Sequence, residues 1–161
     1  IAIDVKTTYR NKSADKFGYT LGGYTSFIRQ GNEKKNIVFP FGDYTEHWVV
    51  GFVYNRLAKK KAGLEHLYPV AKLADIPLPF SDVDFFVQEK WRIASDRAGS
   101  GNTTNIGSIN GLLQDFKDGN GPFISEEEFL DYWRGYGRTK EARKDFSTID
   151  GYRTFKKGKT G

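Results

Sequence analysis

The sequence predicts a domain of the α/β class, more narrowly α+β, that spans residues 1–161 as a single unit. With 161 residues and 38% hydrophobic content, the chain is long enough to bury one core and gives no reason to expect a second. Aromatic residues make up 16% of the chain, which argues against disorder. Some segments alternate like strands and others are spaced like helices, so we expect both kinds of element.

The N-terminal half contains two predicted strands and one predicted helix. Residues 1–6 alternate as a strand, and Asp4 and Lys6 therefore share one face, because strand side chains repeat every two residues. Residues 37–41 (IVFPF) predict a second buried strand that ends near its proline. From 44 to 60, apolar residues recur at helical spacing, and we expect a helix that covers the core.

The C-terminal half reads as irregular chain, strand, loop and helix in turn. Three prolines between 69 and 80 predict an irregular segment, and residues 83–93 alternate like a long strand or a bent hairpin. The stretch AGSGNTTNIGS that follows predicts a turn-rich loop. Ser125 and Glu128 form a predicted capping box ahead of a helix with one apolar face. We expect the basic tail from 152 to 161 to fray.

Composition restricts the partners and cofactors. Lys and Arg outnumber Asp and Glu by 25 to 20, and the net charge of +5 moderately favours a polyanionic partner. Because the chain has no Cys and only two His, thiolate zinc sites and His-rich centres are excluded, and any metal must be held by oxygen. Without an apolar run of about 18 residues or a signal peptide, we expect a soluble, intracellular protein with no membrane partner. Since Ile1 lies inside a predicted strand, we expect the chain to be a fragment of a longer protein.

Asp4 and Lys6 are the first candidates for chemistry. The pattern of acid, any residue and lysine occurs at 4–6, 33–35 and 115–117, but only the first follows a β-branched strand that would hold both side chains rigidly. In phosphodiester hydrolysis a carboxylate can hold Mg²⁺ beside the phosphate, while a lysine orients or activates water and offsets developing charge. The alternative is a strand-end ion pair that contributes up to ~1 kcal/mol of stability. These residues alone leave both interpretations open.

Five segments carry a resemblance to a known family: IAIDVKTTY, TLGGYTSFIR, NIVFPF, AGSGNTTNIGSI and EEEFLDYWRGYGRT. In collinear order over essentially the whole chain, they closely resemble the EcoRV-like type II restriction endonucleases, which are PD-(D/E)xK nucleases. A small insertion lies around 31–34. The resemblance implies a restriction-endonuclease-like mixed β-sheet that is flanked by helices and incomplete at its N-terminus. It also implies a homodimer that hydrolyses duplex DNA with Mg²⁺ in the bacterial cytoplasm.

The resemblance matches Asp4 and Lys6 to the family's second acidic residue and its lysine. Asp4 would ligate the metal, the main-chain carbonyl of Val5 would add an oxygen ligand, and Lys6 would serve the nucleophilic water. The family's first catalytic Asp, on the preceding strand, and a further acidic residue in its N-terminal helix have no counterpart in this sequence. Because a lone carboxylate binds Mg²⁺ poorly, we expect these residues by themselves to fold but to cleave little or nothing.

The predicted loop matches the family's segment that reads bases in the major groove, and its residues are Gly99, Ser100, Gly101, Asn102, Thr103 and Thr104. Glycines let a backbone approach base edges closely, an amide and hydroxyls donate and accept there, and a Thr methyl suits thymine. A flexible surface loop is the alternative, and a phosphate-binding Walker A loop is excluded because no Gly-Lys-Ser/Thr follows. The resemblance favours base reading and implies the palindrome GATATC, cut to blunt ends.

Six further residues match positions at which the family approaches the DNA backbone, and they are Thr8, Ser26, Lys35, Arg138, Thr139 and Arg143. Contacts of this kind position a protein on DNA and do not specify sequence. For the arginines, a solvated helix end is the alternative, and the insertion makes the alignment of Lys35 ambiguous. We expect His47 to pack or cap beside Trp48 and neither histidine to be catalytic. The three tryptophans, Trp48, Trp91 and Trp133, are expected in the core because each lies in an apolar periodic pattern.

Three functions therefore compete. The first is a Mg²⁺-dependent, sequence-specific endonuclease, favoured by Asp4, Lys6 and the loop at 99–104. The second is a catalytically incomplete DNA-binding fragment or a decayed relative, favoured by the missing first Asp, which would bind DNA in a salt-sensitive way without turnover. The third is a structural or protein-binding domain whose basic surface is incidental.

Overall fold

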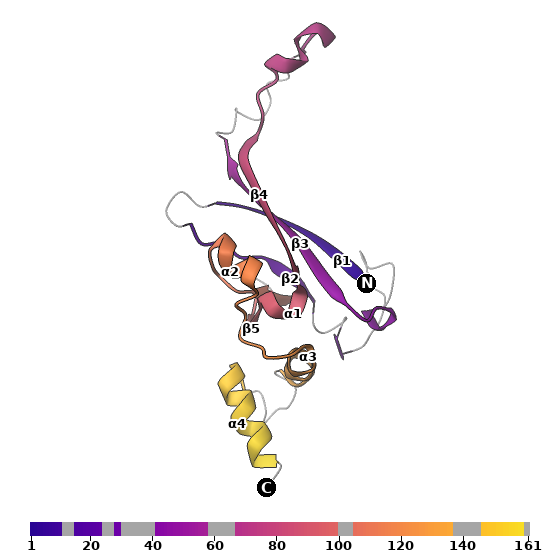
Figure 1. Cartoon of the computed structure of the whole chain (residues 1–161), viewed down its shortest axis with the longest axis vertical. Coiled ribbons are helices and arrows are strands. Elements are labelled where there is room, and N and C mark those ends of the chain that lie inside the picture. Colours follow the sequence, from indigo (N-terminus) through magenta and orange to yellow (C-terminus); the bar gives the residue numbers. More distant parts are fainter. Residues whose placement is uncertain are drawn as a thin grey trace.

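The computed structural model describes residues 1–10, 15–23, 28–29, 41–57, 67–99, 105–136 and 146–159, and the fold is given for these. Figure 1 shows the elements in chain order. They are β1 (Ala2–Tyr9), β2 (Thr20–Gly23), η2 (Phe41–Asp43), β3 (His47–Arg56), η3 (Val70–Asp75), β4 (Phe80–Glu89), α1 (Lys90–Ile93), β5 (Ala94–Ala98), β6 (Asn105–Ser108), α2 (Leu113–Asp118), α3 (Glu126–Gly135) and α4 (Ile149–Lys159).

The strands of the described chain form two three-stranded sheets. In the first, the order is β1-β3-β4, with β1 parallel to β3 and β3 antiparallel to β4. The second has the order β2-β6-β5 and is antiparallel throughout. The helices α1, α2 and α3 lie beside these strands (Figure 1). The predicted mixed sheet flanked by helices is confirmed.

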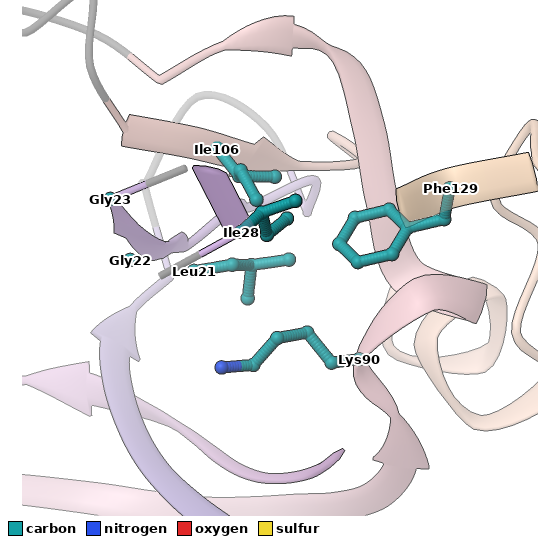
Figure 2. A pocket seen from close by; sticks show the side chains of 7 residues that line it. All are labelled: Leu21, Gly22, Gly23, Ile28, Lys90, Ile106 and Phe129. Carbon is teal, nitrogen blue, oxygen red and sulfur yellow. The ribbon is translucent and has the colours of Figure 1, made fainter. Parts of the chain in front are cut away.

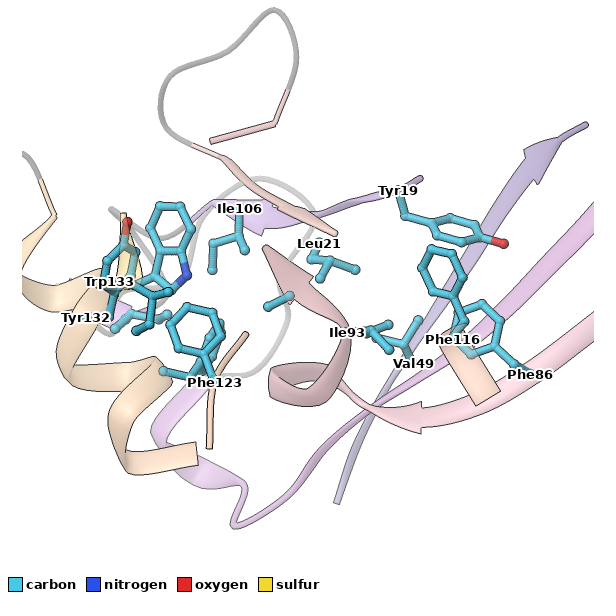
Figure 3. Close-up of a cluster of buried hydrophobic side chains, with 14 of the residues drawn as sticks. Tyr19, Leu21, Val49, Phe86, Ile93, Ile106, Phe116, Phe123, Tyr132 and Trp133 are labelled. Carbon is cyan, nitrogen blue, oxygen red and sulfur yellow. The ribbon is translucent and has the colours of Figure 1, made fainter. Parts of the chain in front are cut away.

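Aromatic rings dominate the core (Figure 3). At one end of it, the ring of Phe116 on α2 stacks on Phe17 at a centroid distance of 4.9 Å and meets Phe86 of β4 at 5.0 Å. At the other end, Tyr132 and Trp133 of α3 are fully buried, and their rings meet edge to face at 5.3 Å. The contact with Phe86 attaches α2 to the first sheet, and the buried rings of α3 belong to the same core.

The first sheet has one buried and one exposed face. On β3, Val49 and Val53 are completely buried, and their parallel-strand partners on β1 are Asp4 and Thr8. The opposite face carries apolar side chains that solvent reaches among the described residues. Their exposed fractions are 66% for Ile3, 62% for Val5, 59% for Phe85 and 50% for Val87. The polar residues of β1 therefore point inward and its β-branched residues point outward.

The prediction of a helix at 44–60 is wrong, because residues 47–56 form the strand β3. Its side chains alternate between buried and half-buried from His47 to Tyr54. Val49 and Val53, which suggested the helix, are four residues apart, and a spacing of four places side chains on one face of a helix and on one face of a strand alike. Residues 47–56 form a strand and not a helix because they pair with β1 on one side and with β4 on the other.

The prediction that the tail at 152–161 frays is also wrong, because α4 runs through most of this tail. The guanidinium of Arg153 donates to both carboxylate oxygens of Glu128 at 2.8 and 2.9 Å and to the carbonyl of Pro122 at 3.0 Å. Tyr152 is buried, and its hydroxyl donates to the Asp131 carboxylate at 2.6 Å. Contacts with α3, which local sequence patterns do not reveal, hold the tail in place.

Other expected elements are confirmed wholly or in part. The helix α3 follows Ser125, whose hydroxyl accepts from the Glu128 backbone N–H at 3.2 Å. The reciprocal bond of the predicted capping box differs, because the Glu128 carboxylate accepts from the N–H of Ile124 at 2.9 Å. The strand expected at 83–93 ends at Glu89, and the chain makes the single turn α1 before β5.

Two remaining expectations have different outcomes. The segment at 69–80 contains the kinked short helix η3 and is otherwise irregular up to Phe80, where β4 begins. The strand expected at 37–41 falls almost entirely outside the described residues, and only Phe41 is placed, in η2.

Gly51 generates the first testable prediction. A Cβ at this position would lie 2.2 Å from Cε1 of Phe86, so the ring can cross β3 only where no side chain is present. Gly51→Ala is expected to lower the free energy of unfolding by about 1–3 kcal/mol, as measured by urea denaturation. The matched control is Gly158→Ala in α4, whose Cβ meets nothing within 4 Å and which should raise stability slightly. Equal effects of the two substitutions would contradict this account.

The pair of Arg153 and Glu128 generates a second prediction, on pH. The hydrogen bonds from Arg153 hold the pKa of the Glu128 carboxyl below its ordinary value. The stabilisation is therefore complete above that ordinary value, about 4.3, and is lost as the pH falls through the lowered pKa of the folded state. Glu128→Gln is expected to cost about 1–2 kcal/mol of unfolding free energy at pH 7 and much less at pH 3.

Urea denaturation at the two pH values measures this loss. In a double-mutant cycle with Arg153→Gln, the double variant should lose less than the sum of the two single losses, because both substitutions remove the same contact. Strict additivity would show that the two side chains are not coupled.

Candidate functional site

Asp4 and Lys6 lie side by side on the inner face of β1. The Nζ atom of Lys6 is 3.1 Å from Oδ1 of Asp4, and the two side chains are 27% and 29% exposed. The shared face predicted from the strand alternation is confirmed. Both groups are ordered by the strand and still accessible from solvent, as a hydrolytic site requires.

A second lysine, which the sequence analysis did not identify, completes the cluster. The Nζ atom of Lys90 lies 3.2 Å from Oδ2 of Asp4, and the Lys90 side chain is only 9% exposed. Burial lowers the pKa of Lys90, and the charge of the Asp4 carboxylate opposes that shift. Sequence reasoning missed Lys90 because its contact with Asp4 joins two distant parts of the chain, which local spacing does not reveal.

The main-chain carbonyl of Val5 points away from β3. The N–H groups of Ala2 and Arg10 donate to the carbonyls of Glu46 and Tyr54 at 2.8 and 2.9 Å. The backbone N–H and C=O groups of the even-numbered residues of β1 therefore point toward β3. Successive residues of a strand direct their backbone groups to opposite edges, and Val5 therefore faces the other edge. Since β1 is an outer strand of the described sheet, this carbonyl lies beside Asp4 at the edge of the sheet.

The oxygen donors at this edge match Mg²⁺ in type and only partly in number. A carboxylate and a carbonyl are ligands that this ion prefers, and protein sites of this kind complete its octahedron with water and phosphate oxygens. Within the described residues, however, no three His, Cys, Asp or Glu side chains come together as a metal site. Asp4 is the carboxylate of the cluster, and it also contacts both lysines.

Thr8 extends the inner face of β1. It lies two residues beyond Lys6 and is half-buried, as Asp4 and Lys6 are. The strand therefore presents a carboxylate, an ammonium group and a hydroxyl in one row along the same face.

The predicted recognition loop is described only at its base. The N–H of Gly99 donates to the carbonyl of Asn105 at 2.8 Å, which closes the ends of the loop between β5 and β6. Helices support this base, because the carbonyl of Asp96 on β5 accepts from the Tyr132 hydroxyl at 2.6 Å, and the Asp96 carboxylate accepts from the N–H of Ile149 at 3.0 Å. These contacts connect the described base of the loop to the helices α3 and α4.

Several predicted residues fall outside the described part of the chain. They are Ser26, Lys35, Ser100, Gly101, Asn102, Thr103, Thr104, Arg138, Thr139 and Arg143, together with His66. Their assigned roles stay predictions. Of the described site residues, the structure brings Asp4, Lys6 and Thr8 together on one strand, and it places Gly99 directly after β5 of the other sheet.

The histidine and tryptophan predictions have mixed outcomes. His47 is buried, with its Nδ1 atom 3.6 Å from the Glu126 carboxylate, in agreement with a packing role. Trp133 is fully buried and Trp91 packs against the core, as predicted. The prediction for Trp48 is wrong, because it lies on the opposite face of β3 from Val49. Its half-exposed indole donates to the Glu46 carboxylate at 2.9 Å.

Comparison with known proteins agrees with this geometry. A family model described as restriction endonuclease EcoRV matches residues 1–157. The chain belongs to the EcoRV restriction endonuclease family. The type II restriction enzyme EcoRV of Escherichia coli is 54% identical to it over 156 residues, which are 96% of this chain and 62% of that relative.

The resemblance seen in the sequence is therefore confirmed at the level of the family. This EcoRV-family chain spans only 62% of the length of the relative it matches. Among the described residues, no helix combines the length and apolar character that crossing a membrane requires.

The loop base generates a third prediction. A Cβ at Gly99 would meet its nearest neighbour, the Ile106 carbonyl oxygen, at an ordinary 3.6 Å, whereas one at Gly107 would lie 3.1 Å from the carbonyl oxygen of Arg97. Gly99→Ala should change the free energy of unfolding by less than about 0.5 kcal/mol. Gly107→Ala, on the paired strand, should cost about 1 kcal/mol or more, because the Arg97 backbone must move. Thermal or urea unfolding of the two variants decides, and a larger loss for Gly99→Ala would show that the base is packed differently.

Proposed function

We propose that this chain carries the hydrolytic centre and the base-reading loop of a type II site-specific DNA endonuclease. Its substrate is duplex DNA containing GATATC, which it cuts with Mg²⁺ as a homodimer in the bacterial cytoplasm. Membership of the EcoRV family supports the class of reaction. The observation that carries the proposal for this chain is the contact of Asp4 and Lys6 at 3.1 Å on an accessible strand face.

Asp4 and Val5 hold the metal ion in this proposal, through the carboxylate and the main-chain carbonyl. When bound, Mg²⁺ acts as a Lewis acid on the scissile phosphate and lowers the pKa of bound water. Lys6 orients the attacking water and offsets the negative charge that develops on the phosphate, since its ammonium group lies beside Asp4. The strand supplies the positioning, because both side chains project from one face two residues apart.

DNA recognition is assigned to the loop and to surrounding backbone contacts. The loop at 99–104 reads base edges in the major groove, and its glycines let the backbone approach them. Gly99 supports this, because its own surroundings leave ordinary space for a Cβ, so the packing of the protein does not require a glycine there. The residues proposed to contact the DNA backbone are Thr8, Ser26, Lys35, Arg138, Thr139 and Arg143. A palindromic site suits a two-fold symmetric dimer that presents one loop to each half-site.

A catalytically incomplete DNA-binding protein is the second candidate. It is favoured because no three His, Cys, Asp or Glu side chains come together among the described residues and two ammonium groups already contact Asp4. Such a protein binds DNA through phosphate contacts, and its affinity falls steeply as salt increases. It turns over no substrate at any Mg²⁺ concentration.

A cleavage assay generates the fourth prediction. The protein is this chain joined to the part of the E. coli relative that lies outside the matched region, incubated with Mg²⁺ and a DNA duplex that contains one GATATC site. We expect blunt-ended products, and Asp4→Asn should reduce the single-turnover cleavage rate by a factor on the order of 10³ or more, because it removes a metal ligand and its charge. Asp75→Asn, which removes an equal charge from the exposed helix η3, should cleave like the parent.

The possible results separate the candidates. Undiminished cleavage by the Asp4→Asn variant would refute the role of Asp4. Salt-sensitive binding of the duplex without any cleavage, in the chain and in the joined protein alike, would establish the second candidate. Failure of both proteins to bind duplex DNA at low salt would refute both proposals.

A further inference from the structure

Both oxygens of the Asp4 carboxylate are in contact with ammonium groups. Oδ1 lies 3.1 Å from Lys6 and Oδ2 lies 3.2 Å from Lys90. The three side chains together carry one negative and two positive charges. A divalent cation that approaches Oδ2 therefore meets a positive charge already placed at the oxygen it would bind.

The two lysines differ in how easily their side chains can move away from the Asp4 carboxylate. The Lys6 side chain is 27% exposed and projects from an outer strand, so its ammonium group has room to adjust beside Asp4 when a cation binds. The Lys90 side chain is 9% exposed, and its backbone is fixed in the single turn α1 between two strands. Withdrawal of Lys90 would require movement of the packed chain around it.

An apolar pocket holds the methylene stem of Lys90 in place. Leu21, Ile28, Ile106 and Phe129 line this pocket together with the lysine. Figure 2 shows the stem extended along Leu21, with its nitrogen at the end away from Phe129. The pocket therefore packs around the apolar part of the side chain, and the charged end lies beside Asp4.

We propose that Lys90 is a positioning residue, a built-in counter-ion that holds the Asp4 carboxylate in its site and competes with a divalent cation for Oδ2. The inference rests on the proposed function in that it takes Asp4 as the metal ligand. Lys90 keeps the partly buried carboxylate paired when no cation is bound, since an unpaired charge there is costly. For the same reason it weakens the binding of the cation.

Substitution of Lys90 separates its charge from its packing. Lys90→Met keeps an unbranched apolar stem for the pocket and removes the charge, whereas Lys90→Arg keeps a positive charge. The probe is Mn²⁺, whose binding to the DNA-free 161-residue chain is followed directly by electron paramagnetic resonance. We expect Lys90→Met to lower the Kd for Mn²⁺ by roughly tenfold, from removal of a like charge within a few ångströms of the ion. Lys90→Arg should retain the weak binding of the parent chain.

The outcomes are distinct. An unchanged or higher Kd in Lys90→Met would overturn the inference, as would an equal gain in Lys90→Arg, which would point to packing. If the parent chain binds too weakly to saturate, Lys90→Met must still give measurable binding, and its failure to do so would also overturn the proposal. The gain must disappear in the double variant with Asp4→Asn, because a cation bound elsewhere would not depend on Asp4.

A second measurement uses the unsubstituted protein and does not depend on the folding of any variant. The ¹⁵Nζ resonance of Lys90 should shift as Mg²⁺ is added, whereas that of the exposed Lys72 in η3 should not. No shift at Lys90 under saturating Mg²⁺ would overturn the competition. Because neither measurement involves DNA, absence of cleavage would refute the proposed function and leave this inference standing.

Discussion

The Asp4 carboxylate joins parts of the molecule that are far apart in the sequence. It contacts Lys6 on its own strand and Lys90 in the turn α1, which links β4 of the first sheet to β5 of the second. Partly buried charges are tolerated only when they are paired, so this cluster restrains β1 relative to the junction of the two sheets. The chemistry proposed for β1 depends on this restraint, because a carboxylate that is free to rotate cannot orient a cation.

The two sheets carry different parts of the proposed site. The first presents the polar row of β1, and the second closes the base of the recognition loop through the bond from Gly99 to Asn105. Both sheets contribute to one apolar core, which includes Val49 and Phe86 of the first sheet and Leu21 and Ile106 of the second. The proposed hydrolytic edge and the base of the predicted recognition loop therefore rest on one continuous core.

The first sheet reverses the usual distribution of polar and apolar side chains along β1. Asp4 and Lys6 point inward, while Ile3 and Val5 are 66% and 62% exposed among the described residues. An exposed apolar face of this extent is uncommon on a folded surface, whereas inward polar groups are typical of sites that do chemistry. The inward face of β1 thus departs from the usual pattern, in which a strand turns its apolar side chains toward the core.

Much of the site was determined by the sequence alone. Strand alternation placed Asp4 beside Lys6, Ser125 marked the start of α3, and the quoted segments indicated the family, because each of these signals lies in neighbouring residues. The tertiary structure decided what local spacing leaves ambiguous. Residues 47–56 form a strand because β1 and β4 pair with them. Contacts such as that of Arg153 with Glu128 hold α4 against α3, and Lys90 reaches Asp4 across the junction of the sheets. Burial and pairing depend on residues distant in the chain, and a periodic pattern does not contain them.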